Sequence, residues 1–277
     1  MKIYRIFLSA LVFALILSNS ASGQGSIYTK SFFSQALNKE MNYNIYLPDD
    51  YQNSEDELPL FLLLHGYTGD HTDWKKQGHV DKTINRLIME DESFPMIIVM
   101  PDAGNSWYVD SDPEISWGHY ETAIIEDLIK HIEKNYPVIK DKNSRFIAGL
   151  SMGGYGALHL AFKYPDLFKA ASSMSAAYMQ KVPDNYTYLE KTFGEPLNRE
   201  KYQHESPFNL ASSDSTRQMP VYITCGDDDL RLYHYSVDMY DTLTAKQYPV
   251  ELRITDGAHT WEVWAREIKN VIRFFNQ

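Results

Sequence analysis

Short, continuous apolar runs separate longer amphipathic stretches along most of this chain. Three runs have the length of buried strands, residues 58–64, 96–100 and 145–148, and two later segments, 221–225 and 250–255, fit further strands. Strands that are covered on both faces of a parallel sheet have continuous apolar sequences, whereas half-exposed strands alternate. We therefore predict a mostly parallel central sheet.

The amphipathic stretches between these runs predict helices. The clearest covers 121–135, where apolar side chains share one stripe and Pro137 follows the end of the helix. Further helices are expected at 81–89, 155–162 and 261–275. Such an alternation of strands and helices is typical of an α/β fold with helices on both faces of the sheet.

Three other regions complete the expected architecture. Residues 27–47 alternate in polarity as antiparallel edge strands do. Residues 103–120 and 178–215 are rich in polar residues, glycines or prolines and carry weaker signals of regular structure. Loops at the carboxyl ends of parallel strands build the site in α/β sheets, so we expect these two stretches to form loops or a small cap over a cleft.

The first residues have the composition of a secretory signal peptide. A positively charged start precedes an apolar run at 6–17, and small residues that suit cleavage after Gly23 follow. The run is shorter than the roughly 20 residues that span a bilayer, which disfavours the alternative of an uncleaved anchor. We expect residues 1–23 to be removed on export, to the periplasm or the cell exterior, and 24–277 to form one domain.

Charge and cysteine content limit the partners. The formal net charge of −11 gives a surface that repels phosphate backbones and anionic lipids. We therefore expect neither nucleic-acid binding nor membrane binding after signal removal. Cys225 is the only cysteine, which excludes an intramolecular disulfide and a cysteine zinc site.

One pentapeptide carries the strongest chemical signal. Residues 149–153 read Gly-Leu-Ser-Met-Gly, a G-x-S-x-G motif between an apolar run and a helical segment. This strand–turn–helix setting is what a nucleophile elbow requires, and the small flanking residues permit its tight turn. Ser151 is therefore the predicted nucleophile.

A serine hydroxyl needs a base that accepts its proton, and four histidines follow Ser151. His159 lies within the elbow helix, His204 in the expected cap, and His234 where a helix could follow the acidic loop. His259 comes between a strand and the last helix, at the edge of the sheet that the elbow occupies. We predict His259 as the base.

The remaining groups of such a site follow from position. An acid that orients the imidazole should follow the preceding strand, where three adjacent aspartates stand at 227–229. Two backbone N–H groups should stabilise an oxyanion: Met152 N–H in the elbow and Tyr67 N–H after the strand at 58–64. The ring of His65 is expected to be structural, and no cofactor is needed.

Taken in order, several segments resemble the putative esterase family of α/β hydrolases. This family includes esterase D, feruloyl and acetyl-xylan esterases of the carbohydrate esterase 1 type, and mycolyltransferases. The resemblance covers about residues 27–275. The segments that carry it are Leu63-Leu64-His65-Gly66, Pro101-Asp102-Ala103-Gly104-Asn105-Ser106-Trp107, residues 149–158, Cys225-Gly226 with its aspartates, and Gly257-Ala258-His259-Thr260-Trp261-Glu262-Val263-Trp264.

The resemblance implies the α/β-hydrolase fold and Ser-His-Asp ester hydrolysis through an acyl-enzyme. It favours Asp229 as the acid, with Asp228 as the second choice, and it supports Met152 and Tyr67 as oxyanion donors. Relatives of the S-formylglutathione hydrolase type usually have a histidine where this chain has Tyr155, and they are usually cytosolic.

Both differences favour an exported serine esterase that removes feruloyl or acetyl groups from plant polysaccharide. The position of the loop and the family together suggest Trp107, Tyr108 and Trp117 as the cleft wall. A thioesterase or acyltransferase on the same fold is the alternative, and a non-catalytic glycan-binding module is the second alternative.

An acidic stretch is the main false signal for a metal. Four carboxylates between residues 110 and 121 have calcium-loop spacing, but Ile115 stands where a glycine is required and Pro113 intervenes. We therefore expect a solvated acidic loop and no metal site.

Overall fold

A twisted eight-stranded sheet runs through the computed structural model, which describes residues 24–49, 51, 56–111, 117–179, 182, 187–212, 214 and 218–277. The strands lie in the order β1-β2-β4-β3-β5-β6-β7-β8. Their bounds are β1 (Ser26–Ser34), β2 (Lys39–Leu47), β3 (Leu60–Leu64), β4 (Ile97–Pro101), β5 (Arg145–Leu150), β6 (Ala170–Met174), β7 (Val221–Gly226) and β8 (Val250–Thr255).

Strand direction confirms the mostly parallel sheet that the apolar runs predict. β1 and β2 form an antiparallel hairpin at one edge, as residues 27–47 predict, and β2 is also antiparallel to β4. All neighbours from β4 to β8 are parallel. Every residue of β3, β4 and β5 is buried. The carboxyl ends of β5 and β7 therefore open onto the same edge of the sheet.

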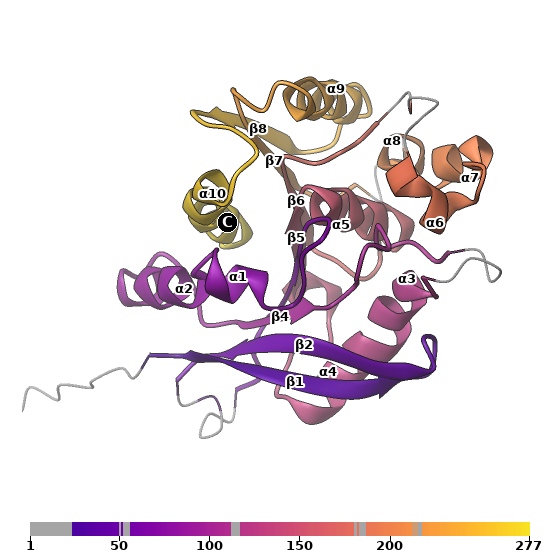
Figure 1. Ribbon diagram of the computed structural model, residues 1–277. Helices are drawn as coiled ribbons and strands as arrows, with labels where there is room; N and C mark the ends of the chain where they lie inside the picture. The colour runs from indigo at the N-terminus through magenta and orange to yellow at the C-terminus, as the bar shows by residue number, and fades with distance from the viewer. Residues whose placement is uncertain are drawn as a thin grey trace, which may run out of the picture.

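Helices cover both faces of this sheet (Figure 1). On one face, α2 (Val80–Met89) and α10 (Trp261–Phe275) pack apolar side chains against the strands, with α1 (Asp73–Lys76) beside α2. The other face is covered by α3 (Tyr120–Thr122), the π-helix η1 (Ala123–Leu128), α4 (Ile129–Asn135), α5 (Met152–Lys163) and α9 (Leu232–Ala245). The expected helix at 121–135 thus contains a π-helical segment.

A small cap follows β6. Its described elements are η3 (Thr187–Leu189), α6 (Glu190–Phe193), α7 (Arg199–His204) and α8 (Pro207–Leu210), and α8 packs against α5 (Figure 1). Short helices separated by turns explain the weak sequence signal of 178–215. The other expected loop is described over 103–111, where it forms turns and no helix or strand, and residues 112–116 lie outside the described part of the chain.

Apart from the short helices, β6 and α9 have no clear signal in the sequence. β6 reads Ala-Ala-Ser-Ser-Met yet is buried throughout, because the start of α5 passes close to it: Ser173 Oγ donates a hydrogen bond of 3.1 Å to the Gly154 carbonyl. Larger side chains would separate the two elements. α9 buries only three of its fourteen residues, so its apolar stripe is too narrow to stand out.

The expected signal peptide, 1–23, lies outside the described residues. Within the described ranges, no helix combines the length and the apolar character needed to cross a bilayer.

Candidate active site

Ser151 occupies the turn between β5 and α5, as the motif predicts. Its backbone has φ 53° and ψ −116°, a strained conformation for a residue with a side chain. Glycines make the turn feasible, because a Cβ at Gly149 would collide with the Gly153 backbone and one at Gly153 would collide with the His65 carbonyl. The turn exposes the hydroxyl at the carboxyl edge of the sheet, at the amino end of α5.

Two loops bring a histidine and an acid to this hydroxyl. His259 Nε2 lies 3.0 Å from Ser151 Oγ, and His259 Nδ1 lies 2.6 Å from Asp229 Oδ2. A carboxylate only accepts hydrogen bonds, so Nδ1 is the donor to Asp229 and Nε2 is left to accept the serine proton. Asp229 is 6% exposed, whereas the side chain of His259 is 37% exposed. The geometry permits proton transfer from the hydroxyl to a solvent-accessible imidazole.

The three neighbouring aspartates differ in what they contact. Asp229 is buried and reaches His259, while Asp227 Oδ1 accepts a hydrogen bond of 3.0 Å from Gly257 N in the loop that carries the histidine. The side chain of Asp228 is exposed, and its N–H donates to the Gly257 carbonyl at 3.0 Å. Of the two acids considered from the sequence, the structure brings Asp229 to the imidazole and leaves Asp228 in solvent.

Two tryptophans, one of them in contact with the imidazole, support the ring of His259 on the protein side. The ring of Trp264 meets that of His259 edge to face, with centroids 4.8 Å apart, and its Nε1 donates to Ser175 Oγ at 3.2 Å. Trp261 packs in turn against Trp264 and Trp74. Edge-to-face packing restricts ring rotation. The imidazole is therefore oriented by the Trp264 ring as well as by its hydrogen bond to Asp229.

The two expected oxyanion donors lie beside the hydroxyl. Met152 is the first residue of α5, where backbone N–H groups have no partner within the helix. Gly66 approaches Ser151 closely, because a Cβ built there would lie 3.6 Å from the Ser151 Cβ. Among the described residues, neither Tyr67 N nor Met152 N donates a hydrogen bond. Both N–H groups can therefore serve a ligand.

The ring of His65 makes hydrogen bonds within the protein, as expected for a structural role. It is 1% exposed; Ala103 N donates to its Nε2 at 3.0 Å, and its Nδ1 donates to the Gly66 carbonyl at 2.8 Å. Burial lowers the pKa of His65. A neutral imidazole with both nitrogens engaged fixes the backbone that presents Tyr67.

A pocket of about 310 Å³ opens over the hydroxyl. Besides Ser151, His259 and Tyr67 it contains two tryptophans and two polar side chains, one from α1 and one from the residue after it, that were not predicted as site residues. Trp261 and Trp264 were visible only as part of the family motif, and Asp73 and Gln77 carry no local signal. The lining residues are Gly66, Tyr67, Thr68, Gly69, Asp73, Gln77, Leu150, Ser151, His259, Trp261 and Trp264.

The expected cleft wall needs correction. Trp107 and Tyr108 are 2% and 0% exposed, so neither can form a wall. Trp107 packs beneath Tyr67 with ring centroids 6.3 Å apart, and Tyr108 donates through its hydroxyl to the His65 carbonyl at 2.9 Å. Trp117 is half-buried, lies under Lys191 Nζ at 5.3 Å, and does not line this pocket. Both buried residues support the strand-to-loop turn.

A second cluster of titratable groups lies deeper, between α3, α5 and the cap. Glu121, His159 and Glu205 are placed so that they could hold a metal ion. The ammonium of Lys163 already contacts both carboxylates, at 2.9 Å from Glu121 and 2.7 Å from Glu205. A lysine in this position supplies the positive charge that two buried carboxylates need. Asp110 instead binds Thr122 through its carboxylate.

Known proteins share this sequence and architecture. The family described as "Putative esterase" matches residues 34–275. An acetyl esterase of Caldicellulosiruptor saccharolyticus is 24% identical over 269 residues, which are 89% of this chain and 97% of that protein. An endo-1,4-beta-xylanase/feruloyl esterase of Xylanibacter ruminicola is 30% identical over 249 residues, 87% of this chain but only 30% of that longer protein.

A solved structure agrees with the sequence matches. A ferulic acid esterase superposes with a TM-score of 0.78 at 30% identity, covering 91% of this chain and 98% of that one. The family match spans both the elbow and the loop of His259. The chain therefore belongs to the putative esterase family, and it is a serine carboxylic-ester hydrolase with the α/β-hydrolase fold.

Proposed function

We propose that this esterase removes feruloyl or acetyl groups from plant polysaccharide, with Ser151 as nucleophile, His259 as general base and Asp229 as the orienting acid. The observation that carries the proposal is the hydrogen-bonded chain from Ser151 Oγ through His259 to Asp229 at the floor of an aromatic pocket. This arrangement activates a hydroxyl at neutral pH without a metal or cofactor.

The first half of the reaction forms an acyl-enzyme. His259 Nε2 accepts the proton of Ser151 while the serine oxygen attacks the ester carbonyl. The buried carboxylate of Asp229 stabilises the imidazolium that results. Met152 N–H and Tyr67 N–H donate to the oxyanion, and one such donor contributes a factor of about 10²–10³ to kcat. The imidazolium then gives this proton to the leaving sugar oxygen as the C–O bond breaks, so the sugar departs with a free hydroxyl.

The second half repeats these steps with water. His259 removes a proton from a water molecule, which attacks the acyl carbonyl and releases the acid. Ser151 recovers its proton from the imidazolium. The partial exposure of His259 lets solvent water reach the imidazole that activates it.

The pocket supports an acylated sugar as the substrate. Trp261 and Tyr67 give it aromatic surface against which a planar acyl group can pack, as in the relatives named feruloyl esterases. The carboxylate of Asp73 and the amide of Gln77 face the same space and can hydrogen-bond sugar hydroxyls. A glutathione thioester carries carboxylates of its own, which Asp73 would repel.

Export belongs to the same proposal. The charged and apolar pattern of residues 1–23 supports secretion. N-terminal sequencing of protein from the periplasm or the medium should begin at Gln24, and full-length protein confined to the cytosol would contradict export.

The decisive experiment compares mature wild type with Ser151→Ala on p-nitrophenyl acetate, methyl ferulate and S-formylglutathione. We expect turnover of the two oxygen esters by the wild type alone, with acetylated and feruloylated xylan as confirming substrates. Turnover that is fastest on S-formylglutathione would instead favour the thioesterase. Activity retained by the Ser151→Ala protein would remove Ser151 from the mechanism.

A further inference from the structure

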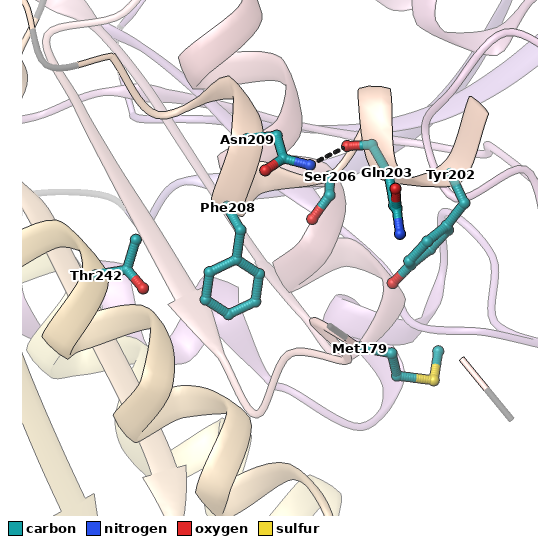
Figure 2. Close-up of a pocket in the computed structure, with 7 residues that line it drawn as sticks. All are labelled: Met179, Tyr202, Gln203, Ser206, Phe208, Asn209 and Thr242. Atoms are coloured by element: carbon teal, nitrogen blue, oxygen red, sulfur yellow. Dashed lines mark hydrogen bonds between the residues drawn. The ribbon is translucent and has the colours of Figure 1, made fainter. Parts of the chain in front are cut away.

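A second hollow lies in the cap, away from the pocket of Ser151. Figure 2 shows it between α7 and α8 of the cap and the α9 helix, with the Phe208 ring near its centre. Its volume is about 440 Å³, within the range of pockets that bind small organic ligands. The residues that line it are Met179, Tyr202, Gln203, Ser206, Phe208, Asn209 and Thr242.

The lining has a uniform chemistry. None of the seven residues is charged at neutral pH, although the whole chain carries a net charge of −11. Two are primary amides, three are hydroxyl-bearing, and the half-buried ring of Phe208 offers aromatic surface. Such a combination suits a neutral ligand with many hydroxyls, because each amide both donates and accepts hydrogen bonds while a ring packs against C–H groups.

Two polar groups at this surface are free to bind. The side chain of Gln203 is exposed, and within the described residues neither its amide nor Ser206 Oγ has a hydrogen-bond partner. Asn209 Nδ2, by contrast, donates to the Gln203 carbonyl at 2.7 Å, which fixes the orientation of its amide (Figure 2). The pocket thus contains both a fixed and a free amide.

Packing holds the pocket in shape. Phe208 meets Tyr178 edge to face with centroids 6.1 Å apart, and Tyr202 packs against Phe193 and Tyr155. Tyr178 is itself anchored through its hydroxyl to Ser173 of β6. A site whose side chains are already ordered loses little conformational entropy when a ligand binds.

The chain itself limits the distance between the pocket and the nucleophile. Ser151 N donates to the Met174 carbonyl at 2.8 Å, and Met179, a lining residue, is five residues further along. Five residues span at most about 18 Å. Met179 follows the carboxyl end of β6 and is the part of the pocket nearest to Ser151 along the chain, so an oligosaccharide bound at Ser151 can extend to it. From there the pocket continues along α9 to Thr242.

We propose that this cap pocket binds unesterified sugar units of the polymer whose acylated sugar occupies the pocket of Ser151. The proposal rests on the polysaccharide substrate proposed above. Sugar units bound far from the reacting carbonyl are held equally in the ground state and the transition state. Their binding therefore lowers KM for the polymer without raising kcat.

The first test measures binding without catalysis. Ser151→Ala protein is titrated with unesterified xylohexaose, followed by NMR or calorimetry. We expect saturable binding that weakens about tenfold, or about 1.4 kcal/mol, when Phe208→Ala or Gln203→Leu is added. Because Gln203 is exposed, Gln203→Leu tests the site even if Phe208→Ala disturbs the cap. Phe33→Ala and Gln35→Leu, at exposed positions of the β1–β2 hairpin, are the matched controls and should bind as the parent does.

The second test uses the otherwise wild-type enzyme. In each cap variant, KM for a feruloylated xylo-oligosaccharide should rise about tenfold relative to KM for methyl ferulate. The ratio of kcat between the two substrates should be the same as in the wild type. If xylohexaose does not bind, or if both cap variants bind it as the controls do, the cap pocket is not a sugar site. Binding that depends on Phe208 and Gln203, in a protein that hydrolyses no ester, would leave the pocket standing and refute the proposed function.

Discussion

Two carboxylate–histidine pairs lie at or in the helix α5, and the distances between carboxylate oxygen and imidazole nitrogen are nearly the same. Asp229 lies 2.6 Å from His259 near the amino end of the helix, and Glu121 lies 2.7 Å from His159 within it. Their surroundings differ. The other nitrogen of His259 faces the Ser151 hydroxyl and the ring is partly exposed. The other nitrogen of His159 faces the Glu205 carbonyl at 2.9 Å, and the ring is fully buried.

This difference decides what each pair can do. A general base needs one nitrogen that can take up a proton from a reacting group. His259 has such a nitrogen, whereas both nitrogens of His159 donate to oxygen acceptors and no substrate can reach them. Lys163 adds a second positive donor to the same carboxylates. We infer that the Asp229 pair serves the reaction and that the Glu121 cluster joins α3, α5 and the cap.

The largest effect should come from removing the nucleophile. Ser151→Ala should lower kcat on p-nitrophenyl acetate by roughly 10⁴–10⁶-fold, because no other group replaces the serine oxygen. The free energy of unfolding should stay close to that of the wild type, since alanine keeps the Cβ at φ 53° and loses only a hydroxyl that is partly exposed. Rates are measured by absorbance at saturating substrate, and stability by urea unfolding. A loss of activity with a parallel loss of stability would point to misfolding instead.

The next largest effect separates the two aspartates. Asp229→Asn should lower kcat by about 10⁴-fold, because an amide can hold the imidazole in the tautomer that cannot accept the serine proton. Asp228→Asn is the matched control one residue away. Its side chain is exposed and makes no hydrogen bond or ion pair within the described residues, so kcat of this variant should equal that of the wild type. Equal losses in both variants would refute the assignment of Asp229.

Local sequence patterns were sufficient to predict which residues form the first pair and its serine. The elbow motif, the order of serine, acid and histidine, and the strand before each loop all lie in short segments around Ser151 and His259. The correct edge strands and most helices came from the same kind of pattern. These signals are local because the turn geometry depends on adjacent residues.

The cluster of Glu121, His159 and Glu205 could not be predicted, because its contacts join residues that are distant in sequence. Glu121 and His159 are 38 residues apart, and Glu205 is 46 residues beyond His159, so no motif joins them. Burial misled the expectation for Trp107 and Tyr108, whose loop position suggested a cleft wall although both support the loop from below. Asp73 and Gln77 reach the pocket from the start of a four-residue helix and from the residue that follows it, and this helix has no sequence signal of its own.

A smaller effect should distinguish the cluster from the active site. Glu121→Gln leaves Lys163 and His159 facing one carboxylate fewer, which should lower the free energy of unfolding by about 3 kcal/mol. Because Glu121 touches neither pocket, kcat on p-nitrophenyl acetate should stay at the wild-type value. Glu126→Gln, which breaks an exposed pair with Lys130, is the matched control and should change stability little. A large fall in kcat for a stable Glu121→Gln protein would connect the cluster to the chemistry.

The smallest predicted effect is the acid response of the same cluster. Burial raises the pKa of Glu121, but hydrogen bonds from His159, Tyr164 and Lys163 outweigh it and lower the pKa to about 2. The folded-state pKa is thus below the usual value of 4.5, so the contribution of Glu121 to stability is complete above about pH 5. It decreases as the pH falls toward 2, because the unfolded chain takes up the proton first.

By pH 3 the wild type should therefore lose about 2 kcal/mol that Glu121→Gln, which has no proton to bind at this position, does not lose. Urea unfolding of both proteins between pH 7 and pH 3 measures the difference. The active-site pair should not contribute to this difference, since Asp229 and His259 are unchanged in both proteins. Parallel curves for the two proteins would show that Glu121 is not held in its charged form by the cluster, and the contrast with Asp229 would then rest on solvent exposure alone.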